Sequence, residues 1–271
     1  MSEAGTSQES ATFKSDLLKG KKGIIFGVAN KRSIAWAIAR ALSSHGAQLA
    51  FTYQGDRLKE SVAELAATLP GQSPLYPCDV TKDGEVKKVF EELGRDFGTL
   101  HFLVHAIAFA KKEELDGRTI DTSREGFQLA LDVSSYSLVA LAKAAEPLME
   151  KEGGSIVALT YLGSEKVIPN YNVMGLAKAA LESAIRYLAA DLGKKNIRVN
   201  GVSAGPISTL AARGISGFTT MLEGHRNRAA LGRNVEVEEV ANTALFLLSP
   251  LASGITGEII FCDAGYRIMG I

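Results

Sequence analysis

The sequence is poor in cysteine, in excess charge of either sign and in long hydrophobic runs. Its two cysteines, Cys78 and Cys262, are too few for a disulfide framework and favour a reducing compartment. Lys and Arg number 30, as do Asp and Glu, so the zero formal net charge gives no argument for a nucleic-acid partner. No apolar run reaches the roughly 18 residues of a membrane span. We therefore expect no membrane segment and no nucleic-acid partner.

The N-terminal residues also lack a recognisable targeting signal. They have neither the basic start nor the apolar middle of a secretory signal peptide. We interpret residues 1–16 as a flexible leader and expect a cytoplasmic protein. Residues 17–271 contain no internal repeat, no low-complexity tract and no linker, which favours one domain over two.

From Lys22 onward, short β-rich runs alternate with helical ones. This alternation is typical of right-handed βαβ units around a parallel sheet. It predicts a single doubly wound, Rossmann-type α/β domain, with a seven-stranded parallel sheet and helices on both faces. The predicted strands are Gly23–Phe26, Gln48–Tyr53, Pro74–Cys78, His101–His105, Ser155–Leu159, Arg198–Ser203 and Glu258–Cys262. The predicted helices are Ser33–His45, Arg57–Leu69, Lys82–Phe97, Ser123–Glu150, Tyr171–Leu192 and Val237–Leu248.

One glycine-rich segment, residues 205–232, interrupts this rhythm. Loops of that length inside a compact domain are usually functional lids or disordered. We interpret residues 206–232 as a lid over a site at the carboxyl ends of the strands.

The turn after the first predicted strand is a candidate phosphate site. In doubly wound folds this turn presents the free N–H groups of a helix N-terminus to a ligand. Here it begins at Gly27 and leads to Ser33 and Ile34, but it lacks the Gly-x-Gly-x-x-Gly fingerprint. A surface turn in which Ser33 caps a helix explains the same residues. Further candidates for cofactor contact follow other predicted strands: Gln54, Asp79, Val80 and Ile107.

Tyr161, Tyr171 and Lys178 form the most informative group. Tyr171 and Lys178 are seven residues apart, about 700° of helix rotation, so their side chains lie within about 20° on one face. A lysine near a phenol stabilises the phenolate and can also hold ribose hydroxyls. A core tyrosine followed by a solvated lysine is the alternative that spacing alone leaves open.

The strings around these residues resemble the enoyl-acyl carrier protein reductases, a divergent branch of the short-chain dehydrogenases/reductases. The resemblance extends over Leu17–Met269. The wider family places three residues between its tyrosine and lysine, whereas six intervene here and a second tyrosine stands ten residues earlier. The strings that carry the resemblance are YLGSE (161–165), IPNYNVMGLAK (168–178), FTYQ (51–54), DVSSYS (132–137), RVN (198–200) and SAGPI (203–207).

The resemblance implies a role for each matching position. Three positions would be catalytic: Tyr171 would donate a hydrogen bond to the thioester oxygen, Lys178 would bind the nicotinamide ribose, and Tyr161 would stand beside Tyr171 on the acyl-chain side with a part in proton delivery. Ala110 would touch substrate. The implied cofactor contacts are Gly27, Ser33, Ile34, Gln54, Asp79, Val80, Ile107, Lys178, Ile207, Ser208, Thr209, Leu210 and Ala211. One departure is Ala108, where the family has glycine.

The implied activity is hydride transfer from NADH to the β-carbon of a trans-2-enoyl thioester on acyl carrier protein, the last step of the fatty acid elongation cycle. No metal site is implied, and the resemblance implies a homotetramer. Two alternatives stay open: a ketoreductase of the same fold that acts on a 3-oxoacyl thioester, and a non-catalytic dinucleotide-binding protein.

Overall fold

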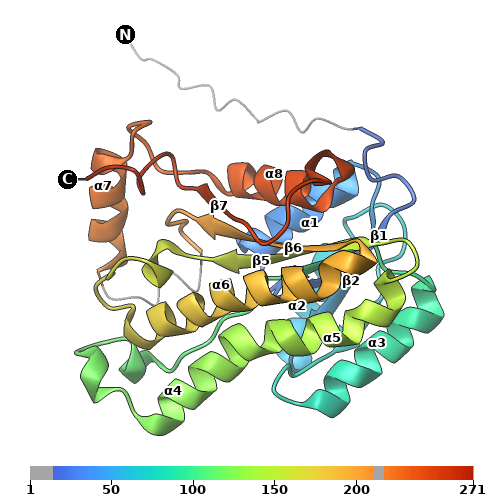
Figure 1. Ribbon diagram of the computed structural model, residues 1–271, viewed down its shortest axis with the longest axis horizontal. Helices are drawn as coiled ribbons and strands as arrows, with labels where there is room; N and C mark the ends of the chain where they lie inside the picture. Colours follow the sequence, from blue (N-terminus) through green and yellow to red (C-terminus); the bar gives the residue numbers. More distant parts are fainter. Residues whose placement is uncertain (1–14, 210–216, 271) are drawn as a thin grey trace.

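The computed structural model describes residues 15–209 and 217–270, and within them the chain is organised around one parallel sheet (Figure 1). Its seven strands lie in the order β3-β2-β1-β4-β5-β6-β7, and every neighbouring pair is parallel. The predicted fold class and all seven predicted strands are thereby confirmed. The strands are β1 (Lys22–Phe26), β2 (Gln48–Tyr53), β3 (Leu75–Pro77), β4 (Phe102–His105), β5 (Gly154–Thr160), β6 (Ile197–Ala204) and β7 (Ile259–Cys262).

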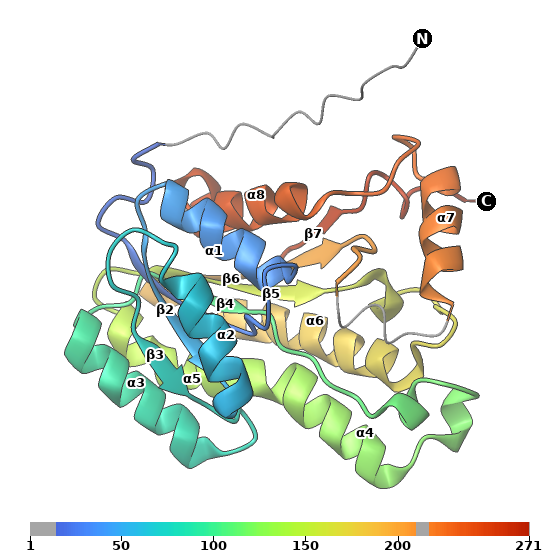
Figure 2. The ribbon, with the colours of Figure 1, turned by 180° about the vertical axis from the view of Figure 1, so that it is seen from behind.

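Helices cover both faces of the sheet (Figure 2). Helices α1, α2 and α8 contribute to one hydrophobic core, and α3, α5 and α6 to the other. The α-helices are α1 (Ile34–Ser44), α2 (Asp56–Ala66), α3 (Asp83–Phe97), α4 (Arg124–Leu131), α5 (Ser137–Met149), α6 (Asn172–Leu192), α7 (Phe218–Arg228) and α8 (Val237–Leu248). Short 3-10 turns are η1 (Lys112–Glu114), η2 (Thr119–Asp121), η4 (Leu162–Ser164), η5 (Gly193–Lys195) and η7 (Pro250–Ala252), and η3 (Asp132–Tyr136) is a π-helical turn.

The strand sequences are apolar on both sides because both faces are buried. Ile25 and Val104 belong to the core with α1 and α8, whereas their neighbours Ile24 and Leu103 belong to the core with α3, α5 and α6. Side chains alternate across a strand, so a parallel sheet covered on both faces has near-continuous hydrophobic strands. This is why the strands were recognisable as short apolar runs.

Two polar side chains of β6 hold the connection that follows α8. Arg198 donates to the carbonyl oxygens of Leu247 (2.8 Å) and Ser249 (3.1 Å), and Asn200 donates to that of Ile255 (2.9 Å). These bonds satisfy carbonyl groups at and beyond the C-terminus of α8, which a helix leaves without intrahelical partners. The RVN string therefore has a structural role at the end of the sheet opposite the strand carboxyl ends.

Two sequence predictions differ from the structure. The single helix predicted over Ser123–Glu150 is divided into α4 and α5 by the π-helical turn. The segment predicted as a loop over residues 205–232 contains α7, whose two internal or adjacent glycines and weak apolar pattern hid it. Most of the predicted leader, residues 1–14, lies outside the described residues, and its flexibility stays a prediction.

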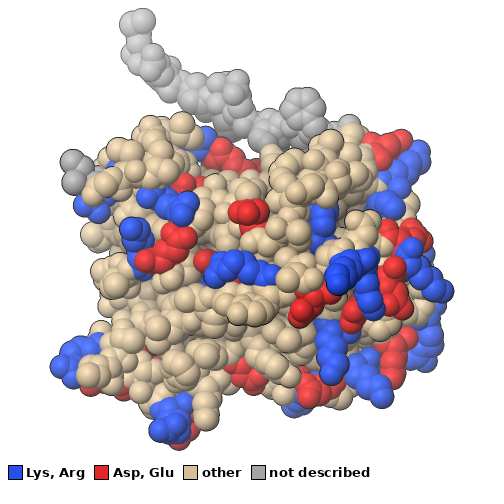
Figure 3. All heavy atoms as spheres, viewed as in Figure 1, with Lys and Arg blue, Asp and Glu red and all other residues tan. Residues whose placement is uncertain are grey.

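The face of the molecule in Figure 3 carries basic and acidic side chains interspersed, without an extended area of one sign. Among the described residues, no helix is long and apolar enough to cross a membrane. Both cysteines are free thiols, with Cys78 buried and Cys262 partly exposed.

Candidate functional site

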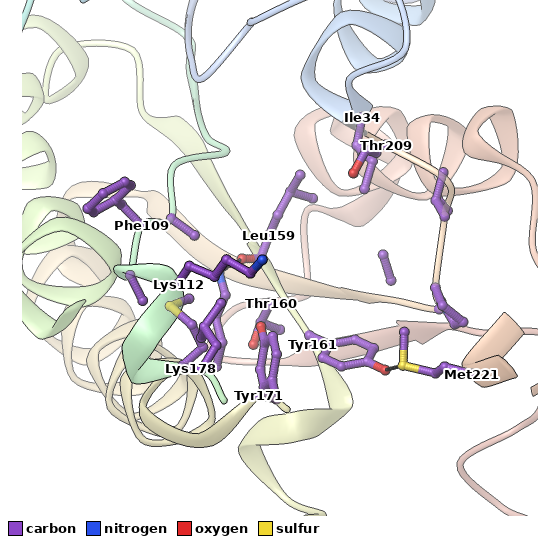
Figure 4. A pocket seen from close by; sticks show the side chains of 18 residues that line it. Ile34, Phe109, Lys112, Leu159, Thr160, Tyr161, Tyr171, Lys178, Thr209 and Met221 are labelled. Carbon is purple, nitrogen blue, oxygen red and sulfur yellow. Dashed lines mark hydrogen bonds between the residues drawn. The ribbon is translucent and has the colours of Figure 1, made fainter. Parts of the chain in front are cut away.

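A cavity of about 460 Å³ lies at the carboxyl ends of β4, β5 and β6. Open α/β sheets bind ligands at this edge, next to the point where the strand order reverses. Figure 4 shows Phe109 on one side of the cavity, Ile34 and Thr209 on another, and the two tyrosines below them. The lining residues are Ile34, Ala108, Phe109, Ala110, Lys112, Leu115, Leu159, Thr160, Tyr161, Tyr171, Met174, Lys178, Ala204, Gly205, Pro206, Ile207, Thr209 and Met221.

Tyr161 and Tyr171 pack against each other in this cavity. Their ring centroids are 5.1 Å apart and their planes meet at 73°, an edge-to-face arrangement. The Tyr161 hydroxyl donates to the sulfur of Met221 on α7 at 3.5 Å (Figure 4). Tyr161 follows the last residue of β5, and Tyr171 immediately precedes α6. The sheet and the helix therefore each position one of the two phenols.

Close backbone approach fixes the Tyr171 ring. A Cβ atom at Gly163 would lie 2.5 Å from Cδ1 of Tyr171, and a Cβ atom at Gly175 would lie 2.8 Å from the carbonyl oxygen of Gly163. Real Cβ atoms do not approach other atoms so closely, so both positions require glycine for this packing. The ring of Tyr171 consequently lies directly on the η4 turn.

Lys178 is a buried cation whose ammonium group lies among polar groups of β5. Its side chain is only 5% exposed, and its Nζ donates to the carbonyl oxygen of Leu159 at 2.7 Å. Glu182, one helical turn further along α6, is also buried and accepts from the hydroxyl of Thr160 at 2.6 Å. A buried cation is stable only when it is paired and hydrogen-bonded, and Glu182 provides the opposite charge.

Burial determines the protonation of this site. It raises the pKa of Tyr161 to about 12, and it also raises the pKa of Tyr171 well above the ordinary value. Burial lowers the pKa of Lys178 to about 8, although the Glu182 carboxylate acts in the opposite direction. His105, fully buried at the end of β4, has its pKa lowered to about 3 by burial and by the charge of Lys178. At neutral pH both phenols hold their protons and His105 is neutral.

The β1–α1 turn has the features of a phosphate site. Gly27 has φ +100°, and a Cβ atom there would lie 2.1 Å from the carbonyl oxygen of Ala106. Ser33 caps α1 by accepting from the backbone N–H of Trp36 at 3.2 Å. The backbone N–H groups of the first turn and the helix dipole make such an N-terminus attractive to anions. Ser33 can therefore be both a helix cap and a phosphate contact, because the capping residue lies at the same helix N-terminus that attracts the anion.

Other predicted cofactor residues lie along the same edge but do not line the cavity. The Asp79 carboxylate accepts from both the backbone and the side chain of Thr81. Partial burial acts to raise its pKa, but these hydrogen bonds, the charge of Lys82 and a hydrogen bond with Gln54 together lower it. Val80 is buried in the core beside α3, and Ile107 is partly buried against it. Gln54 and Asp79 thus place polar groups after β2 and β3, where the adenosine half of a dinucleotide binds in such folds.

The remaining predicted residues divide into three groups. Ile34, Ala110, Ile207 and Thr209 line the cavity together with the catalytic candidates. Ser208 is exposed and does not line it. Leu210 and Ala211 lie outside the described residues.

Sequence reasoning missed several residues that line the cavity, and one beneath it. Phe109, Lys112 and Leu115 come from the connection after β4 and Met221 comes from α7, and only the folded chain places these two segments together. Glu182 had a detectable signal, because it stands four residues after Lys178 and so on the same face of α6.

A nicotinamide dinucleotide fits the residues present. Asp79 and Gln54 follow β3 and β2, the β1–α1 turn next to them presents the N-terminus of α1, and Lys178 offers a buried ammonium group beside β5. Across the sheet these features occur in the order adenosine, pyrophosphate and nicotinamide ribose, which is their order along a dinucleotide.

Comparisons with known proteins identify the family. The family model described as enoyl-(acyl carrier protein) reductase matches residues 27–267. The NADH-dependent enoyl-acyl carrier protein reductase of Bacillus subtilis is 56% identical over 252 residues, covering 93% of this chain and 97% of that protein. The corresponding reductase 1 of Rhizobium meliloti is 53% identical and covers 95% of this chain and 94% of its own length.

Solved structures agree with the sequence relatives. The Bacillus cereus enoyl-acyl carrier protein reductase with NADP+ and indole naphthyridinone superposes with a TM-score of 0.92 at 53% identity, covering 94% of this chain and 99% of that one. The Anaplasma phagocytophilum reductase in complex with NAD has the same TM-score at 47% identity, with 95% and 98% covered. Since the match in sequence and in fold extends over nearly the whole chain, this protein belongs to the enoyl-acyl carrier protein reductase family.

Proposed function

We propose that this protein reduces the carbon–carbon double bond of a trans-2-enoyl thioester carried on acyl carrier protein, with NADH as the reductant. The observation that carries the proposal is the cavity that Tyr171 and the buried Lys178 line together, at the edge of the sheet where dinucleotides bind. The similar proteins of Bacillus subtilis and Rhizobium meliloti are named as NADH-dependent enzymes of this activity.

Each side chain has a distinct part in the proposed reaction. Bound NADH supplies the hydride that reaches the β-carbon. Tyr171, protonated because its pKa is raised, donates a hydrogen bond to the thioester oxygen as negative charge builds into an enolate. Lys178 holds the hydroxyls of the nicotinamide ribose and so orients the nicotinamide toward the substrate.

The rest of the cavity wall suits an acyl chain. Phe109, Leu115, Met174 and Met221 give it an apolar surface, and the ring of Tyr161 packs edge-to-face against Tyr171 next to Met221. Removing water from such a site strengthens the hydrogen bond that Tyr171 donates. Tyr161 therefore shapes the site beside the thioester, and its raised pKa keeps its proton in place.

The activity is tested by supplying crotonyl and acetoacetyl thioesters of acyl carrier protein with NADH and following the nicotinamide absorbance. We expect rapid oxidation of NADH with the crotonyl substrate and almost none with the acetoacetyl substrate. The reverse preference would establish the ketoreductase alternative, which the six residues between Tyr171 and Lys178 disfavour. NADH binding without turnover of either substrate would establish the non-catalytic alternative.

The proposed cofactor preference is for NADH over NADPH. Gln54 follows β2 at the place where the adenosine ribose would lie, and no pair of basic residues comes immediately after it. A cationic cluster would favour a 2′-phosphate, although Arg57 three residues on weakens the discrimination. Comparing kcat/KM for the two cofactors checks this preference, and a higher value with NADPH would contradict it.

We further propose a homotetramer located in the cytoplasm. Tyr187 on α6 is 74% exposed and Leu251 in η7 is 67% exposed, and apolar side chains so exposed suit interfaces between copies. The two free thiols are compatible with a reducing compartment. Light scattering on the purified protein tests the assembly, and fractionation of the source cells tests the location.

A further inference from the structure

The backbone is left-handed on both sides of Tyr171. Among the described residues, only Asn170, Asn172, Asn196 and Ala264 have a positive φ without being glycine, at 60°, 29°, 56° and 57°. Two of these four residues flank the tyrosine of the site. Non-glycine residues occupy this region rarely, and strained positions that persist are concentrated at functional sites. Contacts with other parts of the protein must therefore stabilise the positive φ values at the start of α6, because the chain does not favour them locally.

The side chain of Asn172 supplies such a restraint. Its amide nitrogen donates to the carbonyl oxygens of Asp116 and Gly117, both at 3.2 Å. Its amide oxygen accepts from the hydroxyl of Thr119, also at 3.2 Å. Three hydrogen bonds thus join the first residue of α6 to a segment more than 50 residues earlier in the chain.

These bonds are not those of a helix cap. A capping side chain accepts from a backbone N–H of its own first turn. The N-terminus of α6 has no side-chain cap among the described residues, and the Asn172 amide bonds instead across to residues 116–119. Its three bonds therefore support the position of the helix entry relative to the rest of the site.

Both ends of this connection belong to walls of the cavity. Leu115, adjacent to the bonded segment, lines the cavity, and Tyr171 precedes Asn172 directly. On its other side the Tyr171 ring lies against Gly163. Tyr171 is thus restrained through two separate contacts, one at its ring through Gly163 and one through the residue that follows it, Asn172.

We propose that Asn172 is a positioning residue, which holds the entry of α6 so that the Tyr171 hydroxyl faces the reacting oxygen of the substrate. This role rests on the proposed function. When the restraint is lost, the Tyr171 hydroxyl is still present but is no longer held in one position. Small displacements of a reacting group reduce turnover strongly.

The central test is Asn172→Gly, because glycine accepts a positive φ while the three side-chain bonds are lost. We expect kcat on a crotonyl-acyl carrier protein substrate to fall roughly 10- to 100-fold. The Kd for NADH should stay within about twofold, since Lys178 on the next turns of α6 is untouched. Asn196→Gly is the matched control: it changes a left-handed asparagine at the start of β6, far from the cavity, and kcat should not change.

A double-mutant cycle separates positioning from general destabilisation. If Asn172 acts through the Tyr171 hydroxyl, Asn172→Gly should lower kcat little further in a Tyr171→Phe background. Wild-type kcat in Asn172→Gly, a full additional loss in the Tyr171→Phe background, or a loss confined to NADH affinity would each overturn the role. Should Asn172→Gly fail to fold, Thr119→Val removes one of the bonds from the other side, and kcat should fall while NADH affinity persists. Absence of turnover by the wild-type protein would overturn the proposed function itself.

Discussion

Single hydroxyl groups in the cavity determine what the site can do. Tyr161 and Tyr171 are in contact, yet only Tyr171 immediately precedes the helix that carries Lys178. Tyr161 instead donates a hydrogen bond to the sulfur of Met221. A hydroxyl already engaged with a protein acceptor is less free to donate to a substrate, so the two tyrosines are not interchangeable.

Replacement of Tyr171 by Phe should lower turnover by roughly 10²-fold or more, because a donor to a developing oxyanion is lost. NADH binding should persist, since Lys178 and the Gly27 turn are unchanged. Steady-state kinetics with a crotonyl-acyl carrier protein substrate and a fluorescence titration of NADH measure the two quantities. Tyr161→Phe serves as the comparison and should lose less, and a Tyr171→Phe enzyme with wild-type kcat would remove Tyr171 from the mechanism.

NADH affinity should fall as the pH rises through about 8, the pKa to which burial lowers Lys178. The negative charge of bound NADH would stabilise the charged lysine, so we expect the pKa of Lys178 to be higher in the complex than in the free protein. Between these two pKa values the complex holds more protons, which makes binding weaker at higher pH. Titrations of NADH fluorescence from pH 7 to 9.5 measure the trend. Lys178→Met should bind weakly with a flatter profile, and an unchanged slope in that variant would assign the titration to another group.

At the scale of elements, the short turn η4 packs closely against the N-terminal part of α6 and against Tyr171, which precedes it. Gly163 in η4 and Gly175 in α6 permit contacts that any side chain would block. The turn and the helix can therefore approach this closely only because neither glycine carries a Cβ atom.

Gly163→Ala should displace the Tyr171 ring and lower kcat by about tenfold or more, with little change in NADH affinity. The displacement is expected because the added methyl would meet the ring at 2.5 Å. Gly193→Ala, at the end of α6 where a Cβ meets nothing within 4 Å, is the matched control. It should keep wild-type kcat and be neutral or slightly stabilising. Equal activity of the two variants would mean that the ring accommodates the methyl without moving its hydroxyl.

The sequence predicted the strands and most helices because each lies between glycine or polar turn residues. It missed α7, since Gly217 and Gly224 and a largely polar composition resemble a loop. It also joined α4 to α5, because hydrophobic periodicity does not distinguish a π-helical turn from continued α-helix.

The sequence allowed prediction of the site residues that lie close together in one short stretch. It did not allow prediction of contacts between segments that come together only in the folded protein. Tyr161, Tyr171 and Lys178 share one stretch of sequence, and the structure places all three in one cavity. Asn172 lies in the same stretch, but its partners on residues 116–119 are visible only after folding. The positive φ of Asn172 likewise could not be predicted from the sequence.

For the whole molecule, the exposed tyrosine of α6 offers a test of assembly. Tyr187→Glu should convert a tetramer to smaller particles, because a charge buried at an apolar interface is costly. Gln72→Glu, at an exposed polar position before β3, is the control and should leave the mass unchanged. Light scattering during size-exclusion chromatography measures both. An unchanged tetramer in Tyr187→Glu would place the interfaces elsewhere on the molecule.

The rod formed by α4, η3 and α5 buries one side against the protein, and one row of buried residues runs along most of its length. Every fourth residue of the row is buried: Gly126, Ala130, Ser134, Leu138 and Ala142. In a regular α-helix each step of four residues overshoots a full turn by about 40°, so this row would drift by about 160° from end to end. The wider π-helical turn underwinds the rod and cancels part of that drift.

This underwinding lets the α4 end and the middle of the row keep close contacts with the protein at the same time. A Cβ atom at Gly126 would lie 2.2 Å from the carboxylate of Glu114, so the α4 end must face that side chain closely. In the middle of the row, the hydroxyl of Ser134 accepts from the backbone N–H of Phe109 at 3.0 Å and donates to its carbonyl oxygen at 3.2 Å. A regular α-helix would swing one of these contacts away from its partner. The rotation of this rod about its own axis thus determines the position of Ser134, and through its hydrogen bonds the position of Phe109 at the cavity.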